Sequence, residues 1–181
     1  LALDFDLVPD SLRSRAAERL AADVRQMGHL TTGFLGTPAL TRTLSENGYL
    51  DDAYALLLND QYPSWLYEVK QGATTVWERW DGQKPDSTFQ ESSMNSFNHY
   101  AYGAVGDWMY RVVAGLNDDP AQPGYKHVVI RPQPGGGFTY ARAALVTPYG
   151  DAASGWKLDG DRLTVTAIIP PNTRASVHLP G

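Results

Sequence analysis

Apolar residues recur at helical spacing in the first part of the chain. Between Asp10, which can cap a helix, and Gly28, which can end one, the apolar positions fall on one face: Leu12, Ala16, Leu20, Val24 and Met27. Spacing of this kind, i, i+3 and i+4, is typical of an amphipathic helix. We therefore predict a first helix that begins at Asp10 and stops at Gly28.

Shorter helices are predicted next from their end signals. Thr37-Pro38 supplies an N-cap and a first-turn proline, and Asn47-Gly48 is the matching stop. Residues 51–58 read as another helix, and Tyr62-Pro63-Ser64 opens a short one that ends at Gly72. Repeated helical units without strands favour a toroid of paired helices or a helix bundle.

The longest helix is predicted between Ser93 and Leu116. Its apolar positions form an unbroken stripe: Phe97, Tyr100, Ala101, Ala104, Val105, Trp108, Met109, Val112, Val113 and Leu116. His99 lies near the predicted N-terminus of this helix and off the stripe. That position suits an imidazole presented to a pocket, and it suits a surface histidine equally well.

After this helix the pattern changes to short strands. The run Asn117–Gly124 is rich in Asp, Pro and Gly and breaks any helix, so we predict a helical domain at 1–119 and a β domain at 120–181. β-branched segments separated by turns follow, which predicts an antiparallel sandwich; they cover residues 126–131, 138–146, 155–158, 162–169 and 174–179. His127 and His178 alternate with apolar residues, so both are predicted to face solvent. Trp156 offers at most a weak platform for a sugar.

The composition narrows the function classes. The chain has 181 residues, 43% of them hydrophobic, and a net charge of −5. It has no basic stripe that could neutralise phosphates, which argues against a nucleic-acid partner. It has no apolar run long enough to span a membrane, so we expect no membrane partner. The absence of cysteine excludes disulfides and thiolate chemistry and fits either a soluble protein of the cytoplasm or a secreted one. No metal or cofactor motif is present, and none is expected.

The stretch Gly72–Gly82 carries the candidate chemistry. It reads Gly-Ala-Thr-Thr-Val-Trp-Glu-Arg-Trp-Asp-Gly, so Glu78 stands between two indoles, Trp77 and Trp80, and beside Arg79. The indoles can form a flat apolar floor for a sugar ring. Their desolvating effect would raise the pKa of Glu78, while Arg79 would lower it. A catalytic carboxylate and an aromatic cluster with a satisfied salt bridge both fit this pattern.

Four ordered blocks carry a resemblance to a known family: His29–Pro38, Tyr62–Tyr67, Gly72–Gly82 and Ser96–Gly103. Together with a tail reading Ile-Pro-Pro-Asn-Thr at 169–173, they make nearly the whole chain resemble the C-terminal part of a bacterial α-L-rhamnosidase of glycoside hydrolase family 78. The resemblance implies part of an (α/α)6 barrel followed by a small β-sandwich. It also implies hydrolysis of terminal α-L-rhamnosides with inversion.

The same resemblance assigns roles to residues. It makes Glu78 the general base and His99 a residue that contacts rhamnose. From the local pattern at 72–82 we expect Trp77, Trp80 and Arg79 as further substrate contacts. His29 would line the cleft by the family pattern, although its sequence context alone favours a loop residue bonded to the backbone. An inverting glycosidase also needs a general acid across the scissile bond. In the family that acid belongs to an arginine-containing acidic motif upstream of these blocks, and this sequence lacks it.

The chain is also too short for a complete barrel. About twelve helices of typical length would need more than its first 117 residues. We therefore expect a C-terminal piece whose partner is the remainder of the same enzyme, and which does not hydrolyse rhamnosides on its own. Two other hypotheses remain open. One is a sugar-binding protein without catalysis, and the other is a different toroidal glycosidase in which Glu78 is paired with a local acid, Asp86 or Glu91.

Overall fold

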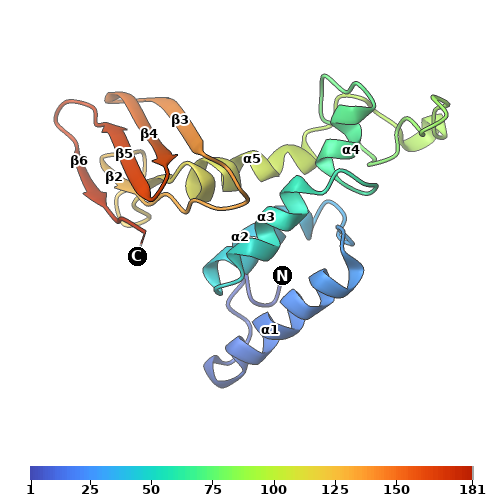
Figure 1. Ribbon diagram of the computed structural model, residues 1–181, viewed down its shortest axis with the longest axis horizontal. Helices are drawn as coiled ribbons and strands as arrows, with labels where there is room; N and C mark the ends of the chain where they lie inside the picture. The colour runs from blue at the N-terminus through green and yellow to red at the C-terminus, as the bar shows by residue number, and fades with distance from the viewer. Residues whose placement is uncertain (181) are drawn as a thin grey trace. The chain divides into compact units, whose positions relative to one another are not determined.

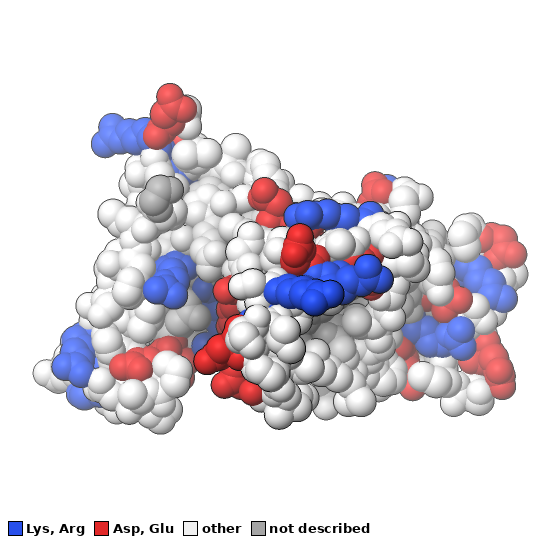
Figure 2. Space-filling view, turned by 90° about the horizontal axis from the view of Figure 1, so that it is seen from below, with Lys and Arg blue, Asp and Glu red and all other residues white. Residues whose placement is uncertain are grey.

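The computed structural model describes residues 1–180. The chain divides into two compact units: Leu1–Val105, which is helical and rich in loops, and Gly106–Gly181, which carries the strands (Figure 1). The predicted order of a helical segment followed by a two-sheet β module is confirmed. Within residues 1–180 no helix is both long enough and apolar enough to cross a membrane. On the face seen in Figure 2, basic and acidic side chains are intermixed.

The helices of the first unit lie close to their predicted positions. They are α1 (Asp10–Met27), α2 (Thr37–Glu46), α3 (Leu50–Leu58) and α4 (Trp65–Lys70). Gly28 ends α1 in the left-handed conformation, at φ +70°, where a glycine is favoured. The Ser64 hydroxyl caps α4 by accepting the Tyr67 N–H at 3.0 Å. Helices α2 and α3 pack side by side (Figure 1).

The prediction of one long helix between Ser93 and Leu116 is wrong. A single 3-10 turn, η1, covers Ser92–Met94, and the chain is then non-helical as far as Tyr100. A continuous helical run follows, formed by η2 (Ala101–Ala104), α5 (Val105–Trp108) and the π-helical turn η3 (Met109–Val113). Residues 95–100 leave the helix because the backbone N–H groups of Ser96 and His99 bond to the loop around Glu78 instead.

Two three-stranded sheets form the second unit. One has the order β1 (Leu116–Asp118), β2 (His127–Ile130), β6 (Arg174–Val177), and the other has the order β3 (Tyr140–Thr147), β4 (Gly150–Asp159), β5 (Arg162–Ile168). The second sheet is antiparallel throughout, as predicted. Strands β2 and β6 are parallel, so an entirely antiparallel sandwich is wrong for this pair. A strand that returns after a whole intervening sheet can enter in either direction, which strand patterns alone do not determine.

The core of the second unit ties its strands to the end of the helical run. Trp156 on β4 is 3% exposed, and its Nε1–H donates to the Val113 carbonyl at 2.6 Å. The Ser154 hydroxyl donates to the Ala114 carbonyl, also at 2.6 Å. Gly115 has φ +77°, and a Cβ there would lie 2.1 Å from the nitrogen of Pro132, so this close crossing requires glycine. Because Trp156 is buried, it does not offer even the weak sugar platform that the sequence allowed.

Candidate active site

The loop that carries Glu78 is paired with the segment that precedes the helical run at 101–113. The Glu78 N–H donates to the Ser96 carbonyl at 2.9 Å, and the Ser96 N–H donates to Glu78 Oε2 at 2.7 Å. On the same two segments, the His99 N–H donates to the Val76 carbonyl at 2.9 Å. The structure therefore brings Glu78 and His99, which are 21 positions apart in the printed sequence, onto adjoining segments.

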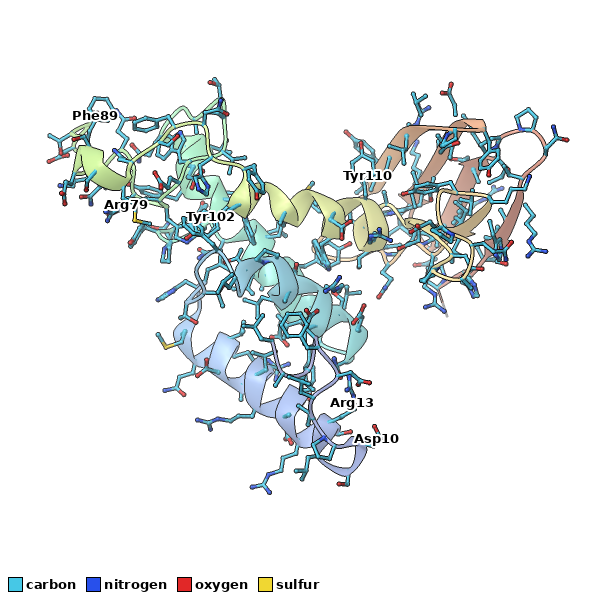
Figure 3. All side chains as sticks on the ribbon, turned by 180° about the vertical axis from the view of Figure 1, so that it is seen from behind. Asp10, Arg13, Arg79, Phe89, Tyr102 and Tyr110 are labelled. Carbon is cyan, nitrogen blue, oxygen red and sulfur yellow. The ribbon has the colours of Figure 1, made fainter. Side chains whose placement is uncertain are left out.

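Arg79 does not pair with Glu78. Its Nε donates to Asp81 Oδ1 at 3.1 Å, and Asp81 also accepts a hydrogen bond from the Gln90 side chain. The sequence predicts that Arg79 would lower the pKa of Glu78 against the effect of the indoles. These contacts do not support that prediction, because the Arg79 guanidinium pairs with Asp81 instead. Figure 3 shows Arg79, Phe89 and Tyr102 at the loop-rich end of the first unit.

The two indoles beside Glu78 are core residues of the first unit. Trp77 is 4% exposed and meets Phe97 edge to face, with 5.1 Å between ring centroids. Trp80 is 8% exposed, and its ring stacks on Tyr102 at 3.8 Å. A sugar stacks on a ring face that solvent can reach, so this burial favours the alternative interpretation of an aromatic cluster, and contact of either indole with the substrate stays a prediction. The local pattern of two tryptophans around an acid could not reveal which partners cover the rings.

The aromatic contacts join all four sequence blocks of the resemblance. Phe34 from the first block packs against His99 and Tyr102 of the fourth, with centroid separations of 4.8 and 5.2 Å. Trp65 from the second block meets Trp80 of the third at 5.5 Å, and its Nε1–H donates to the Tyr102 carbonyl at 2.8 Å. Stacked and edge-to-face aromatic pairs of this kind stabilise a cluster beyond their buried area. The four blocks therefore meet in one aromatic cluster around the Glu78 loop.

The two candidate histidines of this unit have different surroundings. The His99 ring is half-buried and lies nearly parallel to Phe34, at an interplanar angle of 21°. It precedes the helical run at Ala101 rather than lying within a helix. The His29 ring is also half-buried, and its Nδ1 lies 2.8 Å from the Leu30 carbonyl. That contact agrees with the interpretation of His29 as a loop residue bonded to the backbone rather than as a residue that lines the cleft.

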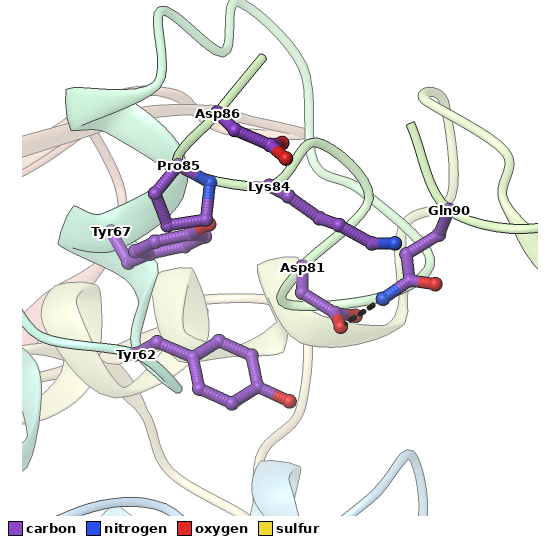
Figure 4. Close-up of a pocket in the computed structure, with 7 residues that line it drawn as sticks. All are labelled: Tyr62, Tyr67, Asp81, Lys84, Pro85, Asp86 and Gln90. Atoms are coloured by element: carbon purple, nitrogen blue, oxygen red, sulfur yellow. Dashed lines mark hydrogen bonds between the residues drawn. The ribbon is translucent and has the colours of Figure 1, made fainter. Parts of the chain in front are cut away.

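A hollow of about 440 Å³ opens within the first unit (Figure 4). Its lining combines two tyrosines with charged and amide side chains: Tyr62, Tyr67, Asp81, Lys84, Pro85, Asp86 and Gln90. It includes Asp81 from the Glu78 loop, but neither Glu78 nor His99. The hollow is therefore a neighbour of the candidate site along the chain and not the site itself.

Comparison with known proteins decides the family. The model described as the bacterial alpha-L-rhamnosidase 6 hairpin glycosidase domain matches residues 1–113, and the model of the bacterial alpha-L-rhamnosidase C-terminal domain matches residues 115–181. This chain belongs to the bacterial α-L-rhamnosidase family. The resemblance stated from the four blocks is thereby confirmed. The two models meet between residues 113 and 115, and the boundary after residue 119 stays a prediction.

Individual relatives agree with this assignment. An α-L-rhamnosidase of Streptomyces avermitilis is 49% identical over the whole of this chain, which covers 18% of that protein. A crystal structure of the S. avermitilis α-L-rhamnosidase complexed with L-rhamnose matches 97% of the chain with a TM-score of 0.91. Native α-L-rhamnosidase from Aspergillus terreus matches 99% at 44% identity with a TM-score of 0.94. The chain spans about a fifth of the length of these relatives.

Glu68 is a buried acid that the sequence of this rhamnosidase-family chain did not indicate. Glu68 on α4 is 4% exposed, and its Oε2 accepts the Trp77 N–H at 3.4 Å, one residue before Glu78. Burial raises the pKa of Glu68 to about 7, and the Trp77 hydrogen bond opposes that rise. Glutamate in a short helix usually faces water, so no local signal separates Glu68 from a surface residue.

The second unit contains a hydrogen-bonded triad of Asp119, His127 and Ser176. His127 is half-buried, with Nδ1 2.9 Å from Asp119 Oδ2 and Nε2 2.8 Å from Ser176 Oγ. The prediction that His127 faces solvent is therefore wrong, whereas His178 is exposed as predicted. The connectivity is that of a hydrolase triad. Ser176, however, pairs with Val129 inside the parallel ladder rather than standing on an exposed turn, and the three side chains fasten β6 to β2 and to the loop after β1.

Proposed function

We propose that this chain supplies the general base and a substrate contact for the hydrolysis of terminal α-L-rhamnosides with inversion. The observation that carries the proposal is the pairing of the Glu78 segment with Ser96–His99, which holds a half-buried carboxylate and an imidazole on adjoining segments. The names of the relatives supply the substrate class.

In the proposed reaction the Glu78 carboxylate takes a proton from a water molecule. The oxygen of that water attacks the anomeric carbon, and the bond to the leaving oxygen breaks on the opposite face of the sugar. The two carboxyl groups of an inverting pair stand roughly 6.5–9.5 Å apart, which leaves room for this water. His99 would hold a sugar hydroxyl. A general acid gives its proton to the leaving oxygen as its bond to the sugar breaks, and we place this acid in a part of the enzyme outside these 181 residues.

Local acids are poor substitutes for that missing partner. A general acid needs a pKa raised toward the working pH. Hydrogen bonds from Thr88 lower the pKa of Asp86, which is exposed. Glu91 is exposed too and accepts a hydrogen bond from Ser93 at 2.9 Å. Glu68 has a raised pKa, but its 4% exposure keeps it from reaching a glycosidic oxygen.

The test uses the full-length enzyme that contains this chain and an aryl α-L-rhamnoside. Glu78→Gln should lower kcat about 10²- to 10⁴-fold, the usual cost of losing general base assistance, with little change in KM. His99→Ala should mainly raise KM, because a ring that contacts hydroxyls binds substrate and transition state alike. NMR of the early product should show β-L-rhamnose, as inversion requires.

The matched controls are Glu91→Gln and Asp86→Asn, which remove exposed carboxylates of the same loop region. Both should keep wild-type kcat. Wild-type turnover in Glu78→Gln would refute the assignment of the base. Loss of activity in Asp86→Asn with an intact Glu78 would instead support a local acid, and tight sugar binding without any turnover would support the non-catalytic alternative.

A further inference from the structure

Glu68 is the most unusual polar group of the first unit. It lies on α4, it is 4% exposed, and its Oε1 has no hydrogen-bond partner among residues 1–180. Its other oxygen accepts only the long 3.4 Å bond from the Trp77 N–H. Buried carboxyl groups normally have an ion pair or several hydrogen bonds, because desolvation of an unpaired one is costly. A leucine would fill the same space without that cost.

The surroundings of Glu68 are aromatic rather than basic. Burial and the Trp77 bond account for its raised pKa, and no cation contributes to it. Burial raises the pKa of nearby Tyr102, and the charge of Glu68 adds to that rise. Tyr102 in turn stacks on Trp80 in the cluster that joins the four blocks. The Glu68 side chain thus links α4 to the segment that carries Glu78 and lies close enough to Tyr102 for its charge to raise the pKa of that residue.

The position of its hydrogen bond suggests what Glu68 does. The Trp77 N–H that it accepts lies one residue before Glu78. On the other side of the loop, Ser96 binds both the N–H and the carboxylate of Glu78. The loop is otherwise irregular, since residues 73–80 contain no helix or strand. Glu68 therefore supplies the contact from α4, and Ser96 supplies the contact from the opposite segment.

We infer that Glu68 is a positioning residue, which fixes the Trp77 peptide so that the Glu78 carboxylate keeps the orientation it needs as a base. The inference rests on the proposed function of Glu78. Reacting groups that move by about 1 Å can lose on the order of 100-fold in rate, so a modest shift of this loop would matter. Glu68 itself touches neither water nor substrate in this role.

Three variants of the full-length enzyme test the inference. Glu68→Leu removes the acceptor and keeps the volume, so kcat should fall about 10- to 100-fold with KM nearly unchanged. Its melting temperature should not fall, because a costly buried acid is gone. Glu68→Gln keeps an oxygen acceptor at the same reach and should restore kcat close to wild type. Glu68→Asp shortens the side chain by one methylene and should lose kcat as Glu68→Leu does.

Each outcome decides whether Glu68 positions the Glu78 loop or only fills space in the core. Wild-type kcat in Glu68→Leu would overturn the inference. Equal losses in Glu68→Gln and Glu68→Leu would also overturn it, because an acceptor would then not suffice. Should Glu68→Leu fail to fold, the comparison of Glu68→Gln with Glu68→Asp gives the same decision, since only the first retains the reach to Trp77.

A double variant separates this inference from the proposed function. If Glu68 acts only through Glu78, then adding Glu68→Leu to Glu78→Gln should cost no further activity. An active Glu78→Gln enzyme would refute the function of Glu78 whatever Glu68 does. An inactive Glu78→Gln enzyme beside a fully active Glu68→Leu enzyme would refute the positioning role alone.

Discussion

The two units of the chain treat their buried polar atoms differently. In the β unit, the buried Ser154 hydroxyl and the Trp156 indole each donate to a backbone carbonyl at 2.6 Å. Among the described residues, three buried side-chain atoms have no hydrogen-bond partner, and all lie in the helical unit: Thr43 Oγ1, Glu68 Oε1 and Asn95 Oδ1. Glu68 binds the Glu78 loop, and Asn95 Nδ2 donates to the Gly82 carbonyl at the end of that loop. Two of the three unsatisfied atoms therefore belong to residues that bond to the Glu78 loop, as expected when a site is selected for more than stability, whereas Thr43 lies on α2.

The largest expected effect comes from removing a buried tryptophan, which should reduce stability in both units but activity only in the helical unit. Trp156→Ala should destabilise the β unit by about 3–5 kcal/mol, because it removes a buried ring together with its bond to Val113. Trp77→Ala should cost a similar amount, since that ring is equally buried, and should also lower kcat. Urea unfolding followed with kinetics on the folded fraction distinguishes the two. Trp156→Phe, which keeps most of the ring volume, is the milder control. A loss of kcat in folded Trp156→Ala as large as in Trp77→Ala would break the contrast.

The next effect is a dependence of folding stability on pH, which has opposite sign in the two units. The pKa of Glu68 rises from 4.5 to about 7 on folding, so between these values the unfolded chain releases a proton that the folded chain keeps. Its stabilising contribution is complete below pH 4.5 and is lost as the pH rises to about 7. The loss is about 3–4 kcal/mol at most, at roughly 1.4 kcal/mol per pKa unit.

Asp119 in the β unit changes stability in the other direction. The hydrogen bond from His127 lowers the pKa of Asp119 below 3.8, so its contribution is present at neutral pH and fades as the pH falls below that value. Melting temperatures measured across pH should show the slope from Glu68 disappear in Glu68→Gln. An unchanged slope in that variant would mean that another group titrates in this window.

The smallest effect concerns the triad of the β unit. Ser176→Ala removes one half-buried hydrogen bond to His127 and should cost about 0.5–1.5 kcal/mol. The hydrolysis of rhamnosides should not change, because we assign this network to the joining of β6 to β2. Thermal unfolding and kcat of the same preparation check both parts. A Ser176→Ala enzyme with lost activity and unchanged melting would show that the triad has a chemical role.

Element ends were predictable where the signal is local. Gly28 stops α1 and Ser64 caps α4 through contacts within a few residues, and such contacts can be recognised in the sequence. The blocks that indicated the family were also recognised from the sequence, and they meet in one aromatic cluster. These features could be predicted because each depends on residue types with a strong local preference, such as glycine at a helix end or serine at a helix start.

Features decided by distant partners were missed. The stripe between Ser93 and Leu116 is periodic, yet Ser96 and His99 bond to the Glu78 loop and Leu116 enters a sheet. The cost of leaving a helix is offset by these contacts, which no periodicity encodes. Similarly, Trp80 has an apolar ring in any fold, and packing against Tyr102 and Trp65 makes it a core residue. Glu68 was overlooked because its burial arises entirely from tertiary packing.

The parallel pair β2–β6 has a consequence for the order in which the molecule can assemble during synthesis. The sheet β3–β4–β5 consists of neighbouring strands joined by short turns, so it can form as soon as residue 168 has left the ribosome. Strand β2 must wait for Arg174–Val177, nearly fifty residues after its own translation. Until then the edge of β2 that faces β6 remains unpaired, and such edges invite association with other chains. A ribosome that stalls just before residue 174 would therefore release a chain whose second sheet is formed and whose first is open to aggregation.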